Sequence, residues 1–182
     1  MPAVLIEPLS LLEAKNYLRV EHSADDTLIG AMIAAARVQV ESRTRRALMT
    51  QTWRLLLDRW PSSGTIASPA SPLREVIAAR VRDQAGDAQA LDTDIFIANT
   101  ASSPGLIAFD AGRVIHPVQD VASIEVDIEA GYGAASDVPA PLVQAIRLLL
   151  ARAYEYRGEP DKSHATPEGI TELLAPYRVM SL

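Results

Sequence analysis

Three histidines are the first candidates for chemistry in this chain of 182 residues: His22, His116 and His164. None has a second histidine or a carboxylate at the spacing that places two metal ligands on one helix face. We therefore expect all three at surface or loop positions, with no metal bound.

Two pairs of carboxylates, Asp25-Asp26 and Asp92/Asp94, are the next candidates. They could act as general acid and base only in a cleft that drives their pKa values apart. The sequence around them favours simpler roles. The first pair suits the start of a helix, and the second suits the solvated edge of a strand.

No motif for nucleotide binding or nucleophilic catalysis is present in the sequence. There is no phosphate-binding loop, dinucleotide fingerprint or nucleophile elbow, and Gly131-Tyr132-Gly133 lacks the third glycine of such a fingerprint. The absence of cysteine excludes disulfides, thiolate metal sites and a cysteine nucleophile, and it suits synthesis in a reducing cytoplasm. We expect no cofactor and no enzymatic activity.

Two groups of residues could contact nucleic acid. Arg43, Arg45 and Arg46 could bind phosphate, but they fall in the last turns of a predicted helix, where cations suit the free carbonyls. Trp53 and Trp60 could stack on bases. Trp53 alternates with apolar residues and suits a core, and Trp60, next to Pro61, could lie at a subunit contact.

The net charge of −6 is confined to the middle of the chain. Residues 1–48 carry six basic and six acidic side chains, and residues 138–182 carry five of each. Residues 49–137 carry six basic and twelve acidic side chains. A protein that grips the DNA backbone usually shows the reverse balance, so we expect weak or no binding to duplex DNA.

The elements that must position these residues fall into three parts. Residues 1–48 predict two helices, the first opened by a Ser10–Glu13 capping box and the second near Asp25. Apolar residues recur at helical spacing in the second: Leu28, Ile29, Met32, Ile33, Ala36 and Val40. Residues 49–137 predict short strands at 50–60, 76–82, 94–98, 105–109 and 123–129, punctuated by glycine and proline.

The third part returns to helix. Its apolar stripe comprises Leu142, Val143, Ile146, Leu149, Leu150 and Ala153. This segment is too short to span a membrane and carries Arg147 and Arg152. A short last helix follows over 167–175, with Thr166 as the expected N-cap. The sequence therefore predicts an α+β fold: a helical core formed by 1–48 and 138–182, with Leu28, Met32 and Ile33 packed on Leu142, Ile146 and Leu149, and a small antiparallel β module inserted at 49–137.

Four segments, in the same order along the chain, resemble the phage head–tail connector family, in its longer siphophage and gene-transfer-agent subgroup. The segments are Leu9-Ser10-Leu11-Leu12-Glu13-Ala14-Lys15 with Leu18-Arg19-Val20, Asp25-Asp26 and Leu28-Ile29; Thr44-Arg45-Arg46-Ala47-Leu48 with Thr50-Gln51-Thr52-Trp53; Ala130-Gly131-Tyr132-Gly133 with Asp137-Val138-Pro139-Ala140-Pro141-Leu142; and Leu173-Leu174-Ala175-Pro176-Tyr177-Arg178.

The resemblance implies a structural adaptor at the head–tail junction of the particle and no catalysis. It implies a ring of about twelve copies under the portal protein, which extends the DNA channel and presents a surface to the next tail or stopper component. An acidic channel would let DNA pass without specific binding. Two alternatives are another virion completion or tail-terminator protein and a small DNA-binding module, and the charge balance opposes the second.

The end of the chain is the expected interface with the portal or a neighbouring subunit. A polar segment at 159–165 could act as a hinge. Beyond it lie an apolar stripe on a helix too short to be stable alone, and then a tail with little charge. The interface candidates are Ile170, Leu173, Leu174, Tyr177, Arg178, Val179, Met180 and Leu182. The alternative is that this helix folds back on the core of its own subunit.

Overall fold

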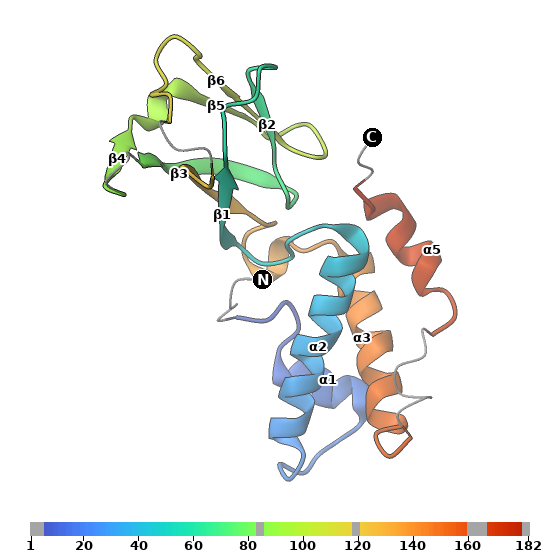
Figure 1. Ribbon diagram of the computed structural model, residues 1–182. Helices are drawn as coiled ribbons and strands as arrows, with labels where there is room; N and C mark the ends of the chain where they lie inside the picture. Colours follow the sequence, from blue (N-terminus) through green and yellow to red (C-terminus); the bar gives the residue numbers. More distant parts are fainter. Residues whose placement is uncertain (1–5, 83–85, 118–120, 160–166, 180–182) are drawn as a thin grey trace. The chain divides into compact units, whose positions relative to one another are not determined.

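A computed structural model describes residues 6–82, 86–117, 121–159 and 167–179 (Figure 1). The chain divides into two compact units. A helical unit comprises Val4–Met49 and Tyr132–Val179, and a β unit comprises Thr50–Gly131. Helices and antiparallel sheets are both present, so the predicted α+β class is confirmed.

In its described residues, the helical unit contains the α-helices α1 (Leu11–Leu18), α2 (Asp26–Thr44), α3 (Ala140–Glu155) and α5 (Ile170–Leu174). Two 3-10 turns, η2 (Ala135–Asp137) and η3 (Ala175–Tyr177), precede α3 and follow α5. Within this unit, α2 and α3 run side by side, and α1 packs against both (Figure 1).

The first helix begins as the sequence predicts. The Ser10 hydroxyl accepts a hydrogen bond from the Glu13 amide at 3.2 Å, and the Glu13 carboxylate accepts from the Ser10 amide at 3.0 Å. This reciprocal pair satisfies two amides that a helix start otherwise leaves free. The hydrogen bond from the Ser10 side chain, more than any other contact, lowers the pKa of Glu13.

One core joins the two ends of the chain within the helical unit. Helix α2 contributes Ile29, Ile33, Ala36 and Val40, and α3 contributes Leu142, Ala145, Ile146, Leu149 and Leu150. The prediction that Leu28 is buried in this core is wrong, because its side chain is 39% exposed. The buried stripe of α2 follows Ile29, one residue further on, and Met32 is only partly buried beside it.

The described residues of the β unit form two antiparallel sheets. The first has the strand order β1-β7-β3-β4, from β1 (Gln51–Leu57), β7 (Ile124–Ala130), β3 (Leu73–Arg82) and β4 (Ala88–Leu91). The second has the order β2-β6-β5, from β2 (Thr65–Ala67), β6 (Leu106–Phe109) and β5 (Phe96–Asn99). The predicted strands near 50–60, 76–82, 105–109 and 123–129 are confirmed.

The strands of the β unit differ from the sequence prediction in two respects. Strands β2 and β4 were not predicted, because they have only three and four residues, too few for alternation to reveal them. The predicted strand at 94–98 begins instead as a 3-10 turn, η1 (Thr93–Ile95), and becomes β5 only at Phe96.

A second core lies between the two sheets. Strand β7 alternates strictly: Ile124, Val126 and Ile128 enter this core, where they meet Ile107 and Phe109 from the other sheet. The sheets approach closely at Gly105, where any side chain would overlap Leu73. The face of β7 that points away from the core is therefore the outer face of the four-stranded sheet.

Candidate assembly surfaces

The C-terminal segment packs on the core of its own unit. Ile170 and Leu174 are buried there, and Tyr177 packs against the same core with part of its surface exposed. Leu173 and Val179 are partly exposed and Arg178 is exposed. Met180 and Leu182 lie outside the described residues.

Backbone and side-chain bonds fix this segment to the end of α2. The Arg46 side chain donates from Nε to the Tyr177 carbonyl at 2.6 Å, and the Val179 amide donates to the Thr44 carbonyl at 3.0 Å. Arg46 also lies over the Tyr132 ring, with Cζ 6.0 Å from the ring centroid. Burial raises the pKa of Tyr132. Arg46 is thus a tether for the C-terminal segment, and the phosphate role weighed for it from the sequence is unnecessary.

The carboxylates first considered for catalysis make contacts that hold helices together. Asp25 accepts a hydrogen bond from the Tyr154 hydroxyl at 2.6 Å, which raises the pKa of Tyr154, and Asp26 pairs with Lys15 at 2.6 Å. These bonds tie the start of α2 to α3 and α1. His22 and His116 are exposed, and His164 lies outside the described residues. Thr166, the expected N-cap of the last helix, also lies outside them, and α5 begins after Gly169.

Within the described ranges, no group of three or more histidine, aspartate or glutamate side chains is placed to hold a metal ion. In the same part of the chain, no helix is both long enough and apolar enough to cross a membrane.

The two tryptophans lie against the core of the β unit. Trp53 is partly buried on the core side of β1. The Trp60 indole donates from Nε1 to the Ile115 carbonyl at 2.8 Å, and its ring centroid lies 4.9 Å from that of Phe109. Both side chains therefore pack within their own unit, and their contacts there account for them without a role in stacking on bases.

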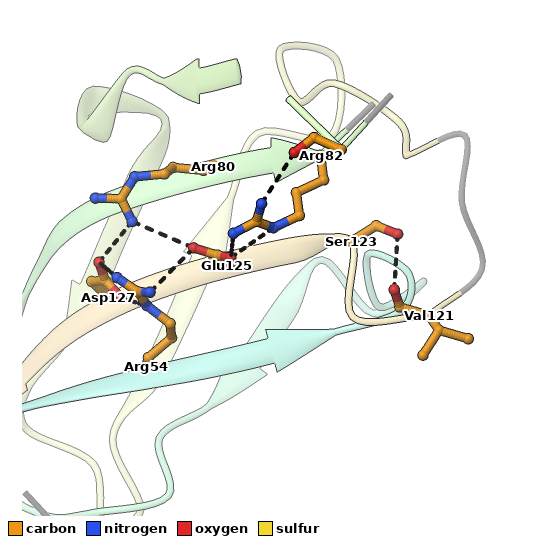
Figure 2. Close-up of polar contacts among 8 residues, drawn as sticks. Arg54, Arg80, Arg82, Val121, Ser123, Glu125 and Asp127 are labelled. Atoms are coloured by element: carbon orange, nitrogen blue, oxygen red, sulfur yellow. Dashed lines mark hydrogen bonds and ion pairs between the residues drawn. The ribbon is translucent and has the colours of Figure 1, made fainter. Parts of the chain in front are cut away.

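The outer face of the four-stranded sheet carries an arrangement of charges that the sequence analysis missed. Glu125 and Asp127 of β7, the central strand, bond to Arg54 of β1 and to Arg80 and Arg82 of β3 (Figure 2). We call these five residues the arginine layer: Arg54, Arg80, Arg82, Glu125 and Asp127. Arg54 binds both carboxylate oxygens of Asp127, at 2.7 and 3.0 Å, and Arg80 binds Asp127 at 2.9 Å. Arg82 donates to Glu125 from Nε at 2.9 Å and from Nη2 at 2.5 Å.

Burial differs sharply between the two signs of charge in the arginine layer. The side chains of Glu125 and Asp127 are 7% and 9% exposed, whereas those of Arg54, Arg80 and Arg82 are 52%, 32% and 42% exposed. The hydrogen bond from Arg54 is the largest of the effects that lower the pKa of Asp127. The surface that a partner meets is therefore guanidinium, although the β unit as a whole is acidic.

A second charged surface of the β unit has the opposite sign. Asp92, Asp94 and Asp110 surround Arg113, and all three raise its pKa, Asp94 most strongly through a hydrogen bond of 2.8 Å. We call these four residues the acidic end. All four are exposed, and three carboxylates for one guanidinium leave an excess of negative charge. The sequence favoured the solvated edge of a strand for Asp92 and Asp94. In the structure, Asp92 precedes η1 and Asp94 lies within it, just before β5 begins.

Comparison with known proteins identifies the class. Residues 8–91 match the sequence model of the family described as Phage gp6-like head-tail connector protein. This segment covers α1, α2 and the first four strands. A search of curated proteins finds no match.

Solved structures extend the likeness to the whole chain. A chain from the "Neck of empty GTA particle computed with C6 symmetry" matches with a TM-score of 0.83 and 26% identity. One from the "Virion of native gene transfer agent (GTA) particle" gives 0.82 and 25%, and one from the "Neck of native GTA particle computed with C12 symmetry" gives 0.80 and 26%. Each match covers 100% of this chain and 96% of the other.

The family match and the structural matches agree. The resemblance to the phage head–tail connector family is confirmed, and the likeness spans both the helical and the β unit. The protein is a structural head–tail connector subunit of a phage or gene-transfer-agent particle.

Proposed function

We propose that copies of this chain form a ring of about twelve under the portal protein, where the ring extends the DNA channel and receives the next tail or stopper component. The observation that carries the proposal is the full-length likeness to chains from particle necks computed with C6 and C12 symmetry. A ring requires two different contact surfaces on each subunit, because each copy binds one neighbour on either side. DNA passes through this ring without specific binding, and the role involves no catalysis.

In this proposal the two parts of the chain have separate tasks. Residues 1–48 and 138–182 act as the helical connector core, and residues 49–137 act as an inserted β module. The helical core in the described residues draws on both ends of the chain, which supports the first assignment.

The C-terminal segment is the proposed contact with the portal or with a neighbouring copy. Ile170 and Leu174 are buried in their own unit, so they hold the segment in place. The surfaces left for a partner are those of Leu173, Tyr177, Arg178 and Val179, to which Met180 and Leu182 add apolar residues in sequence. Tyrosine and arginine are common anchors of protein interfaces.

The experiment for the ring is electron microscopy of particles assembled with and without this chain. We expect filled heads that lack tails when the chain is absent, and a neck ring containing this chain when it is present. Normal tailed particles without the chain would contradict the proposal.

The experiment for the C-terminal contact is the variant R178E, compared with E172K on the same segment. Arg178 and Glu172 are both exposed, so neither change should alter the melting temperature. We expect R178E to lower the fraction of heads that carry tails and E172K to lower it less. Equal attachment in R178E and the wild type would exclude Arg178 from the contact.

A further inference from the structure

We propose that Arg80 of the arginine layer is an anchor that binds a carboxylate of another protein, the next component of the neck, against the outer face of the four-stranded sheet. This inference rests on the proposed function and names the surface that would receive that component. The partner segment has a stated chemistry: an aspartate or glutamate side chain flanked by apolar residues. All the residues that carry the inference belong to the β unit.

The three arginines of the layer use their donors differently. Arg54 donates from Nε and Nη2 to the two oxygens of Asp127, and Arg82 donates from the same two nitrogens to Glu125. Two neighbouring N–H groups of a guanidinium match the geometry of a carboxylate. Arg80 instead contacts Glu125 and Asp127 through Nη1 alone, at 3.6 and 2.9 Å. Among the described residues, its Nε and Nη2 make no hydrogen bond, so the edge that binds carboxylates in Arg54 and Arg82 is unused in Arg80.

The arginine layer holds Arg80 in place. Its two carboxylate partners are buried and lie on the neighbouring strand β7. The Arg80 side chain still has 32% of its surface exposed. Figure 2 shows one nitrogen of its guanidinium toward the two carboxylates and the others turned away from them. An anchor that is fixed before binding loses little conformational entropy when a partner arrives.

Exposed apolar side chains lie in one row with Arg80 across the sheet. Leu56 of β1 is paired with Glu125 of β7. Glu125 is paired in turn with Arg80 of β3, and Arg80 with Ala90 of β4. Directly paired residues point to the same face of a sheet, so this row belongs to the outer face. Leu56 is 57% exposed and Ala90 is also exposed. A protein laid across the row would cover apolar surface on both sides of an arginine, a residue type that often anchors protein interfaces.

Duplex DNA is the other partner that arginines commonly bind, and two observations favour a protein. The three guanidinium groups and two carboxylates of the layer leave a net charge of only +1, and residues 49–137 carry twelve acidic side chains against six basic ones. Affinity for the DNA backbone grows with the number of phosphates that basic residues neutralise. The exposed Leu56 also suits a protein, because burial against apolar side chains removes its surface from water.

The first test compares R80Q and R80K with the control R74Q. Particles are produced with each variant, and the fraction of heads that carry tails is counted by electron microscopy. We expect R80Q to lower this fraction at least about tenfold. R80K keeps a positive charge beside Glu125 and Asp127 but lacks two parallel donors, so it should keep the melting temperature and lose nearly as much attachment. R74Q, at a half-exposed arginine of the same strand, should attach tails as the wild type does.

The second test identifies the partner. The chain contains no cysteine, so A90C can be labelled at a single site with a benzophenone maleimide. Illumination of assembled particles should join residue 90 to a different protein of the neck, and mass spectrometry should find an aspartate or glutamate in the cross-linked peptide. E21C, at an exposed position of the helical unit, is the control and should give no cross-link to that peptide.

The outcomes separate this inference from the proposed function. Necks that contain R80Q or R80K and carry tails as often as the wild type would refute Arg80 as the anchor and leave the ring intact. A cross-link from A90C to a second copy of this chain would assign the outer face to a contact between subunits and overturn the inference. Submicromolar binding of duplex DNA at physiological salt, lost in R80Q, would overturn it in favour of nucleic acid. Absence of the wild-type chain from necks would instead refute the proposed function itself.

Discussion

The two units use the same kind of ion pair at very different depths. In the helical unit, Arg37 binds Glu41 at 2.6 Å and Glu7 at 2.8 Å, and the side chains of Arg37 and Glu41 are 7% and 0% exposed. The second oxygen of Glu41 accepts from the Leu48 amide at 2.9 Å. In the arginine layer of the β unit, only the carboxylates are buried, and the guanidinium groups face solvent.

The buried pair in the helical unit serves the structure of its own subunit, whereas the exposed guanidinium groups of the arginine layer remain accessible to a partner. A buried pair must be satisfied within the subunit, because a lone buried charge is very costly. The Arg37–Glu41 pair accordingly links Glu7, α2 and the Leu48 amide that follows α2. Half-exposed guanidinium groups contribute little to stability in water, but they gain strength when a partner covers them. The comparison predicts large stability effects in the helical unit and smaller ones on the β surface.

The largest effect is expected for E41A. Of the ion pairs that Arg37 makes in the described part of the chain, the change removes the one with Glu41 and leaves the one with Glu7; it also takes away the carboxylate that accepts from the buried Leu48 amide. We expect a loss of about 3–5 kcal/mol in the free energy of unfolding, measured by chemical denaturation. E155A, at an exposed position in the same unit, is the control and should stay within about 0.5 kcal/mol of the wild type. A loss of less than about 1 kcal/mol in E41A would remove the contrast between the units.

A smaller loss is expected for D127N, which keeps the shape of the side chain and removes its charge. Asp127 accepts from both Arg54 and Arg80, but these donors are partly solvated. We expect a loss of about 1–2 kcal/mol in the free energy of unfolding. A loss as large as that of E41A would show that the layer is structural in the same sense as the buried pair.

The pH dependence of the same variant sharpens the prediction. The pKa of Asp127 is lowered in the folded protein from its ordinary value of 3.8, chiefly by Arg54. Its contribution is therefore complete above the unfolded pKa and is lost as the pH falls through the lower, folded value. The difference in unfolding free energy between the wild type and D127N should be constant above about pH 5 and should shrink below pH 4. A difference that grows in acid would contradict this sign.

The helix start in the helical unit provides an intermediate case. S10A removes the hydroxyl that accepts from the Glu13 amide, and it should cost about 1 kcal/mol. S10T should restore most of the loss, because threonine also caps helices. Thermal denaturation of the wild type, S10A and S10T would measure the change in stability. Equal melting temperatures for S10A and the wild type would show that this cap is unimportant.

The smallest effect is expected for R74Q on β3. The Arg74–Glu129 pair is 3.7 Å apart, and the side chains are 45% and 28% exposed. We expect a change within about 0.5 kcal/mol, measured by chemical denaturation alongside D127N. A larger loss would mean that the surface pairs of the β unit are stronger than their exposure indicates.

Part of the fold follows directly from local sequence patterns. The capping box at Ser10 and Glu13, the apolar stripe of α3 and the alternation in β7 each act over a few residues, so the sequence alone predicts them. The error at Leu28 arose because several neighbouring apolar residues in α2 allow the buried stripe to be placed one position away.

The arginine layer could not be predicted from such patterns, because its partners come from strands that are far apart in the chain. Arg54 and Asp127 are separated by 73 positions, and Arg82 and Glu125 by 43. One signal was present: Glu125, Asp127 and Glu129 alternate with apolar residues, and Arg80 and Arg82 show the same spacing. Acidic residues on the outer face of a central strand need cationic partners on its neighbours.

The sequence by itself determined the class of the protein, the α+β composition and the helical character of both chain ends. These properties depend on short motifs and on periodicity, which involve residues close together in the sequence. Tertiary structure alone decided that Arg46 holds the C-terminal segment, that Ile170 and Leu174 are buried, and that the acidic β unit presents guanidinium groups on one face. The physical reason is that burial and charge pairing depend on which residues, distant in the sequence, come into contact. In the β unit, strand order and register determine those contacts.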